Sequence, residues 1–312
     1  MADRLMLLDT ASLYFRAFYG VPDSLKRADG TPVNAVRGLL DIIARLVTDF
    51  EPTHLVACWD DDWRPHWRVE LIPSYKAHRV AEVVPGGPDV EETPDPLEAQ
   101  IPMIRRLLAV LGIPVVGAEH HEADDVIGTL ATTAELPVDV VTGDRDLFQL
   151  VDDARDVRVV YTARGMSKLE VVTDVTVVGK YGVLPAQYAD FAVLRGDASD
   201  GLPGVSGIGE KTAASLLQQF GDLDSLIAAA ADPTAPLSAT MRARISGAAD
   251  YLDVAPTVVE VVRDLVFEPF DARLAPLDPD GVAEIERLAA DWNLGGSVPR
   301  VLKALGNDIE GA

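Results

Sequence analysis

VDVVTGDRD, residues 138–146, is a short β-branched run that ends almost directly in two aspartates. Such a run is typical of a strand that is buried on both faces, as in a parallel sheet. Two further apolar runs have the same form, and each is also followed at once by an aspartate. We therefore expect three short strands, at Leu5–Leu8, Leu55–Trp59 and Val138–Thr142.

Helical patterns lie between these strands. Ala35–Val47, Ile101–Leu111 and Ala123–Ala134 repeat their apolar residues at intervals of three and four, as amphipathic helices do. Strands that alternate with helices predict an α/β protein with a mostly parallel sheet. From about Tyr181 onward the pattern is helical only, with dense glycine between Gly196 and Gly209, so we expect a second, helical subdomain there.

Acidic residues gather where the predicted strands end. Because the carboxyl ends of parallel strands meet at one edge of a sheet, these side chains should lie close together. Taken singly, each could instead cap or stabilise a helix N-terminus. The set comprises Asp9, Asp60, Asp144 and Asp146 after strands, Glu122, Asp124 and Asp125 at a helix start, and Asp197 and Asp200 in the segment GDASD.

So many carboxylates would repel one another unless cations lie among them. Mg²⁺ and Mn²⁺ favour carboxylate oxygens, and two such ions about 4 Å apart can activate water and stabilise the leaving oxygen of a phosphodiester. The pattern therefore predicts a two-metal site. It does not distinguish DNA from RNA as the substrate, or a nuclease from a phosphatase.

The net charge of −23 argues at first against a nucleic-acid partner. That objection weakens if the carboxylates converge on metals and the basic residues are locally concentrated. The densest cationic stretch contains Arg68, Tyr75, Lys76 and Arg79. After Pro73 the last three could share one helical face, where Tyr75 would stack on a base and the two cations would hold phosphates. The alternative is a solvated basic face.

A second candidate contact with nucleic acid is GVSGIGEKTAASLLQQFG, which begins at Gly204. Gly204, Gly207 and Gly209 would permit positive φ angles and close backbone approach before a helix, where free N–H groups can face a phosphate. Lys211 would add a positive charge nearby. The alternative is a plain contact between two helices.

The chain resembles the 5′ nuclease (flap endonuclease) family, in particular the 5′→3′ exonuclease domain of bacterial DNA polymerase I, from about Leu5 to Leu305. The resemblance rests on five ordered motifs: LLDTASLYFRAFYG, WDDDWRPHWRVELIPSYKAHR, EADDVIGTLA, VVTGDRDLFQLV and LRGDASDGLPGVSGIGEKTA. Three features depart from the family pattern: Gly201 stands where the family usually has asparagine, the segment after Arg79 is acidic, and Asp61 and Asp62 follow Asp60.

The resemblance implies a PIN-like catalytic domain at 1–180 with a helical arch around 64–100, through which a 5′ flap passes. It also implies a helical subdomain at 181–290, with a helix–three-turn–helix motif at about 186–222, and a C-terminal tail at 291–312. The first metal would be held by Asp9, Asp60, Glu122 and Asp124, and the second by Asp125, Asp144, Asp146, Asp197 and Asp200.

Further roles also come from the resemblance. It implies two or three Mg²⁺ or Mn²⁺ ions, and a K⁺ held by the carbonyls of Val205 and Ile208. Lys76 and Arg79 would act at the scissile phosphate. The remaining DNA contacts would be Arg16, Tyr19, Arg68, Tyr75, Gly204, Gly207, Gly209 and Lys211.

We therefore expect a structure-specific 5′ nuclease that cuts DNA at a 5′ flap, a nick or a 5′ end, in replication and repair. Because the chain ends soon after the matching region, we expect a standalone monomer, with a DNA polymerase and a ligase as partners. The single cysteine and the lack of an apolar membrane segment favour a cytoplasmic, nucleoid-associated protein.

Other functions predict different sequence features. A PIN-type ribonuclease would not need Gly196–Lys211, and a catalytically silent junction binder should have lost some of the acids, such as Asp144. A phosphatase would have a second acid two residues after Asp9, where this chain has Ala11.

Overall fold

A six-stranded sheet lies at the centre of the structure, a computed structural model that describes residues 3–84 and 87–307. The strand order is β5-β2-β1-β6-β7-β8, and all neighbouring pairs are parallel except β7 with β8. The strands are β1 (Leu5–Asp9), β2 (His54–Cys58), β5 (Val115–Val116), β6 (Val138–Thr142), β7 (Val157–Tyr161) and β8 (Glu170–Val172).

The three strands predicted from the sequence are confirmed to within one residue at each end. Their side chains alternate between the two faces of the sheet, because successive residues of a strand point to opposite sides. Leu5 and Leu7 of β1 belong to one apolar cluster, and Met6 and Leu8 belong to another. Strands β5, β7 and β8 were not predicted.

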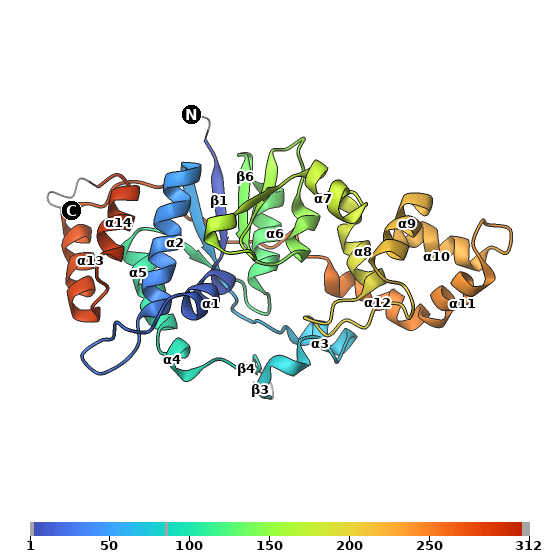
Figure 1. The fold of residues 1–312 in the computed structure, drawn as a ribbon, viewed down its shortest axis with the longest axis horizontal. Coiled ribbons are helices and arrows are strands. Elements are labelled where there is room, and N and C mark those ends of the chain that lie inside the picture. The colour runs from blue at the N-terminus through green and yellow to red at the C-terminus, as the bar shows by residue number, and fades with distance from the viewer. Residues whose placement is uncertain (1–2, 85–86, 308–312) are drawn as a thin grey trace.

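Helices cover both faces of the sheet (Figure 1). On the Met6 side lie α1 (Thr10–Gly20), α2 (Asn34–Phe50) and α5 (Ile101–Val110). On the Leu7 side α6 (Ala123–Thr133) packs against β1, β2 and β6. The predicted helices within 35–47, 101–111 and 123–134 are therefore confirmed, and the mostly parallel α/β fold is as expected.

A helical part extends away from the sheet at the right of Figure 1. It follows α7 (Asp174–Tyr181) and the 3₁₀ turn η4 (Pro185–Gln187). Its helices are α8 (Tyr188–Arg195), α9 (Glu210–Phe220), α10 (Leu223–Ala231), α11 (Ala239–Gly247) and α12 (Ala249–Val259).

After α12 an extended strap, residues 260–274, returns along the sheet. Leu55 N donates to Ala272 O at 2.8 Å, and Leu274 N donates to Thr53 O at 2.9 Å. The strap leads to α13 (Pro279–Trp292) and α14 (Ser297–Ala304), which lie beside α5 and α2.

This return corrects the expected C-terminal boundary. Residues 291–307 do not form a tail, because α14 packs on α2 and buries Val301 and Leu302 in the core on the Met6 side. Helix α13, which was assigned to the helical subdomain, buries Ile285 and Leu288 in the same core. The rest of the predicted tail, residues 308–312, lies outside the described ranges.

The arch at 64–100 also differs from the expectation of a helical segment. It contains α3 (His66–Leu71), a 3₁₀ turn η1 (Ala77–Arg79), the paired short strands β3 (Val80–Glu82) and β4 (Val90–Glu91), and α4 (Asp95–Glu98). Residues 85–86 lie outside the described ranges. Pro73 disfavours a helical conformation in the residue before it, and Ile72 is extended there. Lys76 then takes a left-handed φ of 46°, so Tyr75 and Arg79 do not share a helical face.

Within the parts of the chain that the structure describes, none of the helices combines the length and apolar character needed to cross a membrane.

Candidate active site

A polar cavity of about 340 Å³ opens at the carboxyl edge of the sheet. Strands β1, β2 and β6 all end there, and α6 begins there. Lys76, Arg79 and Arg145 bring positive charge to its wall. Six of the nine predicted metal ligands line it: Asp9, Asp60, Glu122, Asp124, Asp144 and Asp197.

Asp9 is the last residue of β1 and the N-cap of α1, where its Oδ1 accepts from Ser12 N at 3.1 Å. Its Oδ2 accepts from the Thr142 hydroxyl at 2.6 Å, and that hydroxyl oxygen in turn accepts from Asp144 N at 2.9 Å. One hydroxyl at the end of β6 therefore connects two neighbouring strand ends. Sequence reasoning missed Thr142, although its place at the end of a predicted strand beside Asp144 was a usable signal.

Burial and neighbouring carboxylates raise the pKa values of Asp9 and Asp124. Burial, followed by the charges of Asp60 and Asp144, raises the pKa of Asp9 to about 7, although the Thr142 and Ser12 hydrogen bonds oppose the shift. Burial and the charges of Asp9 and Asp144 hold the pKa of Asp124 well above its ordinary value. This cavity is therefore a place where positive charge would be strongly favoured.

Asp60 lies two residues beyond β2, and its Oδ1 accepts from Ala123 N, the first amide of α6, at 2.8 Å. The pKa of Asp60 is raised mainly by burial, which outweighs this hydrogen bond and the nearby Lys76 charge. The helix start thus holds the carboxylate in place at the cavity wall.

Asp146 and Asp200 do not line the cavity, but both are near enough to Asp144 for its charge to raise their pKa values. Burial, and then the charges of Asp144, Asp200 and Asp197, holds the pKa of Asp146 well above its ordinary value. Asp146 Oδ1 is buried, and no hydrogen bond reaches it from any described residue. A buried carboxylate oxygen without a donor is costly, and a divalent cation would satisfy it. The residues present therefore fit a metal.

Asp197 differs from these acids because its donors lower its pKa, although arginines also lie near Asp146 (Arg195 Nη2 at 3.9 Å from Oδ1) and Asp200 (Arg79). Arg195 Nη2 donates to its Oδ2 at 3.1 Å, and Arg145 Nη2 lies 3.6 Å from the same oxygen. Burial acts to raise the pKa of Asp197, but the Ser199 and Arg195 contacts outweigh it and lower the pKa below its ordinary value. Neither arginine was singled out from the sequence.

The carboxylates surround the cavity without forming a preformed ligand group. Among residues 3–84 and 87–307, no three His, Cys, Asp or Glu side chains converge closely enough to be recognised as a metal site by their geometry alone. The case for a metal rests instead on the crowding of acids, on the Asp146 oxygen that accepts no hydrogen bond from a described residue, and on the raised pKa values of Asp9, Asp60, Asp124 and Asp146.

The arch brings its cations to the cavity but not in the predicted way. Tyr75 is buried, and its hydroxyl donates to Glu122 Oε1 at 2.8 Å, so it is not free to stack on a base. Lys76 Nζ donates to Glu122 Oε2. Arg79 Nη2 donates to Ser199 O at 2.8 Å and to Asp200 Oδ1 at 3.1 Å. Lys76 and Arg79 therefore lie where the sequence placed them, at the site, whereas the stacking role of Tyr75 is contradicted.

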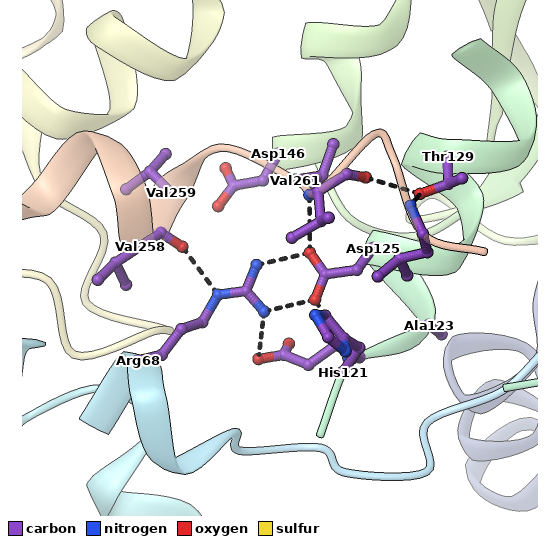
Figure 2. Close-up of polar contacts among 12 residues, drawn as sticks. Arg68, His121, Ala123, Asp125, Thr129, Asp146, Val258, Val259 and Val261 are labelled. Atoms are coloured by element: carbon purple, nitrogen blue, oxygen red, sulfur yellow. Dashed lines mark hydrogen bonds and ion pairs between the residues drawn. The ribbon is translucent and has the colours of Figure 1, made fainter. Parts of the chain in front are cut away.

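Arg68 and Asp125 also need correction (Figure 2). Arg68 is 2% exposed and donates to both oxygens of Asp125, at 2.8 and 2.7 Å, so it does not belong to a DNA-facing surface. Asp125 is fully buried, and it also accepts from the backbone N–H groups of Glu122 and Val262. Burial alone would raise its pKa, but these donors, Arg68 foremost, lower it. Its oxygens are engaged away from the cavity, so Asp125 is not placed as a metal ligand.

The glycine-rich loop runs from Asp197 to the start of α9. Gly204 has a φ of 65°, and a Cβ there would lie 2.5 Å from Gly196 N, so the close approach is real. Gly207 also has a positive φ, of 76°. Gly209 does not: it is the N-cap of α9 with a φ of −100°, and a Cβ there would meet nothing within 4 Å.

The other predicted contacts of this motif lie near the start of α9. Lys211 is exposed in the first turn of the helix. The side chains of Val205 and Ile208 are buried, and Ile208 N donates to Val205 O at 2.9 Å.

Arg16 and Tyr19 line a separate groove of about 800 Å³ between α1 and α2. This groove shares Ser12 and Phe15 with the carboxylate cavity, and Tyr19 is 72% exposed. The two residues therefore lie next to the cavity rather than in it.

Comparison with known proteins agrees with this geometry. The model of the 5′-3′ exonuclease N-terminal resolvase-like domain matches residues 4–182, and that of the 5′-3′ exonuclease C-terminal SAM fold matches residues 183–280. In solved structures the fold is similar to a bacteriophage T5 flap endonuclease complexed with DNA and metal ions (TM-score 0.62, 16% identity, 97% of this chain and all of that one). It is also similar to the catalytic core of Rad2 with a DNA substrate (TM-score 0.60, 16% identity, 97% and 92%).

Curated relatives are closer in sequence. A 5′-3′ exonuclease of Streptomyces coelicolor is 61% identical over 300 residues, which cover 96% of this chain and 99% of that protein. A 5′-3′ exonuclease of Mycobacterium tuberculosis is 49% identical over 317 residues and covers 98% of each chain. A DNA polymerase I of M. tuberculosis is 41% identical over 89% of this chain, which spans 29% of the polymerase. With family models matched from residue 4 to 280 and two relatives matched over nearly their whole length, this chain belongs to the 5′-3′ exonuclease family.

Proposed function

We propose that this chain is a divalent-metal-dependent 5′→3′ exonuclease and flap endonuclease that hydrolyses DNA phosphodiesters. The observation that carries the proposal is the ring of seven carboxylates, the six predicted ligands and Glu91, around a cavity that is also lined by Lys76 and Arg79. A cavity lined by acidic side chains alone would fit metal binding without a phosphate substrate. One lined by basic side chains alone would fit phosphate binding without catalysis. Both together fit the cleavage of a phosphodiester.

Two groups of acids would hold the metals. Asp9, Asp60, Glu122 and Asp124 come from the ends of β1 and β2 and the start of α6, and Asp144, Asp146, Asp197 and Asp200 come from beyond β6 and α8. Bound Mg²⁺ or Mn²⁺ would supply an activated water and neutralise the leaving oxygen. Asp125 is left out of this set because it does not line the cavity, as Glu122 does, and its two oxygens are bound by Arg68 and by backbone amides.

Lys76 and Arg79 would hold the phosphate to be cut. Burial alone would lower the pKa of Lys76, but the charge of Glu122, and then that of Asp200, hold it well above its ordinary value. Lys76 therefore stays protonated at neutral pH, so it can bind a phosphate but cannot serve as a general base. Arg79 lies beside it on η1 and faces Asp200.

The duplex would be held outside the cavity. Gly204 and Gly207 shape the loop before α9, whose free N–H groups and Lys211 would face a phosphate. A K⁺ bound by the carbonyls of Val205 and Ile208 would bridge that loop to the DNA backbone. Arg16 and Tyr19, in the groove beside the cavity, would hold the branch point. This distribution would let a protein of net charge −23 bind DNA through local positive sites.

The remaining predictions concern the cell. We infer that the chain acts as a monomer in the cytoplasm at the nucleoid, alongside a DNA polymerase and a ligase that extend and seal the cut strand. The polymerase and the ligase are inferred from the class of reaction, because cleavage leaves a gap or a nick in one strand.

Cleavage of labelled substrates tests the function. We would compare a 5′ flap, a nicked duplex, a single strand and single-stranded RNA, each with EDTA, Mg²⁺ or Mn²⁺. Wild type should cut the flap and the nicked duplex only with metal. Asp144→Asn should cut these substrates roughly 100-fold more slowly, or slower still. The loss of a metal ligand should cost more than the loss of a residue that only orients a ligand.

The matched control is Asp253→Asn, which changes an exposed acid on α12 and should cut like wild type. Equal rates for Asp144→Asn and wild type, or a preference for single-stranded RNA, would show that the proposed function is wrong.

A further inference from the structure

Three segments that are far apart in the sequence meet at the side chain of Arg68. Arg68 lies on α3, at the base of the arch, and its Nε donates to Val258 O at the end of α12, at 3.1 Å. Its two terminal nitrogens donate to Asp125 in the first turn of α6 (Figure 2). One buried guanidinium therefore joins the arch, the helical part and the helix that borders the cavity.

Asp125 extends this connection to the backbone. Its Oδ2 accepts from Glu122 N at 3.2 Å, at the start of α6, and its Oδ1 accepts from Val262 N of the strap at 2.9 Å. A bidentate arginine–carboxylate pair is geometrically strict, because both N–H···O bonds must lie in one plane. The start of α6 is thus fixed in position and in rotation.

Glu122 is oriented by the same group of residues. Its Oε1 accepts from Arg68 Nη1 at 3.2 Å and from the Tyr75 hydroxyl, and its Oε2 accepts from Lys76. All three donors belong to the base of the arch. The orientation of Glu122 therefore depends on how the arch base is held, and Arg68 is the donor that also binds α6 and α12.

We propose that Arg68 is a positioning residue for the nuclease reaction. By donating to both oxygens of Asp125 it fixes the start of α6, and it thereby orients Glu122 and Asp124 toward the metals. It does not touch the cavity itself. Side chains that bind a metal ligand without touching the metal typically contribute 10- to 100-fold in metal affinity or activity. This inference rests on the proposed function, because it assigns Glu122 and Asp124 to a metal.

A purely stabilising role predicts different behaviour. Buried ion pairs often add little to stability when compared with apolar residues of similar size. A second two-pronged pair in this chain provides the comparison: the half-buried Arg158 binds both oxygens of the fully buried Asp139, at 2.6 and 3.3 Å, and Arg4 Nη1 also donates to Asp139 Oδ1, at 2.9 Å. Asp139 lies near the amino end of β6, at the edge of the sheet opposite the cavity.

The experiment compares three variants of the full chain with wild type. Arg68→Lys keeps the charge but cannot form the planar two-pronged contact. Arg68→Met combined with Asp125→Leu removes both charges, so that neither remains buried and unpaired. Arg158→Lys is the matched control. We would measure thermal unfolding in EDTA, the Mn²⁺ dissociation constant by electron paramagnetic resonance, and kcat and KM on a 5′ flap.

Arg68→Lys should weaken Mn²⁺ binding roughly 10- to 100-fold and lower kcat, with KM for DNA changed by less than about threefold. The double variant should unfold near the wild-type temperature but keep the weak Mn²⁺ binding. Arg158→Lys should unfold at a lower temperature, with Mn²⁺ binding and kcat close to wild type.

Wild-type Mn²⁺ affinity in Arg68→Lys, or its full recovery in the double variant, would overturn the proposal and leave Arg68 a merely structural residue. If Arg158→Lys lost Mn²⁺ affinity to the same degree, the effect would be one of stability, and the proposal would again be wrong. Failure of the proposed function looks different: wild type would bind Mn²⁺ but cut no DNA substrate, and the Mn²⁺ measurements would still decide the role of Arg68.

Discussion

At the scale of single residues, the hydroxyl of Thr142 makes it easier for the buried Asp9 to lose its proton. The hydroxyl donates to Asp9 Oδ2 at 2.6 Å and thereby opposes the burial that raises the pKa of Asp9 to about 7. Below that pH a proton occupies the carboxyl group, and a metal must displace it before it can bind. Asp9 should therefore make metal affinity depend on pH in the neutral range.

We expect Mn²⁺ binding to weaken by about tenfold for each pH unit below 7, if one proton is displaced. Thr142→Val removes the hydrogen bond, so the pKa of Asp9 rises and the transition moves to higher pH. Thr162→Val is the control, because the buried hydroxyl of Thr162 has no hydrogen-bond partner among the described residues. Calorimetric titration of Mn²⁺ between pH 6 and 8 measures all three proteins. A transition that Thr142→Val leaves in place would contradict this account.

The same shift fixes the sign of a stability change in the metal-free protein. A carboxyl group whose folded pKa is raised from 3.8 to about 7 stabilises the fold fully below pH 3.8, and this contribution is lost as the pH rises through 7. With EDTA present, the unfolding temperature should therefore include a component that falls across this range. Bound metal should reverse it, because the ion stabilises the ionised form.

At the scale of elements, the arch base and the loop of residues 197–201 pack backbone against backbone. Lys76 N donates to Asp200 O at 2.9 Å, and the Ser74 hydroxyl donates to Gly201 O at 2.7 Å. Gly201 has a φ of 71°, and a Cβ there would lie 2.0 Å from Ser74 O. Glycine at this position is thus required by the closeness of the arch in this chain.

Gly201→Ala should push the arch base away from the loop and so displace Lys76 and Asp200 together. A displacement of about 1 Å at a reacting centre can lower the rate on the order of 100-fold. We therefore expect kcat to fall by about that factor. Gly179→Ala is the control, because it lies within α7 and a Cβ there meets nothing within 4 Å. Single-turnover cleavage of a 5′ flap measures both. Wild-type rates for Gly201→Ala would show that the arch does not depend on this contact.

The same elements show what the sequence could and could not predict. Strand ends carry a local signal, so the positions of Asp9, Asp60 and Asp144 in the sequence were enough to place them at one edge of the sheet. The arch could not be predicted in this way, since the left-handed turn at Lys76 depends on its contact with Asp200. Helix α14 has a clear apolar periodicity, but only tertiary packing reveals that it covers α2.

Within the site, charge pairing was the least predictable feature. Arg68 belongs to a basic stretch and Asp125 to an acidic one, and nothing in their spacing indicates that they bind each other across 57 residues. Both were therefore assigned to the wrong partners, DNA for the arginine and metal for the aspartate. Composition reveals how much charge a chain carries, whereas pairing is set by the fold.

At the scale of the whole molecule, the chain path brings its described ends to one side. The strap and helices α13 and α14 return to the sheet, so that α2 lies between the N-terminal and C-terminal helices of the core (Figure 1). The helical part with the glycine-rich loop extends from the opposite side. Any duplex held by that loop therefore approaches the cavity from the α9 side, away from α14.

This separation permits a test of how a protein of net charge −23 binds DNA. Overall repulsion should make binding depend on a few local cations, and each cation that contacts a phosphate steepens the dependence of log K on log salt by about 0.9.

Lys211 is exposed in the first turn of α9, and Lys303 is exposed on α14 at the far side. In an Asp144→Asn background with EDTA present, so that the flap substrate is not cut, Lys211→Ala should weaken binding and reduce the salt slope by about 1. Lys303→Ala should leave the slope unchanged, as fluorescence anisotropy across a salt series would show. Equal slopes for the two variants would mean that α9 does not contact the phosphate backbone, and the DNA path would then have to be sought along the groove of Arg16 and Tyr19.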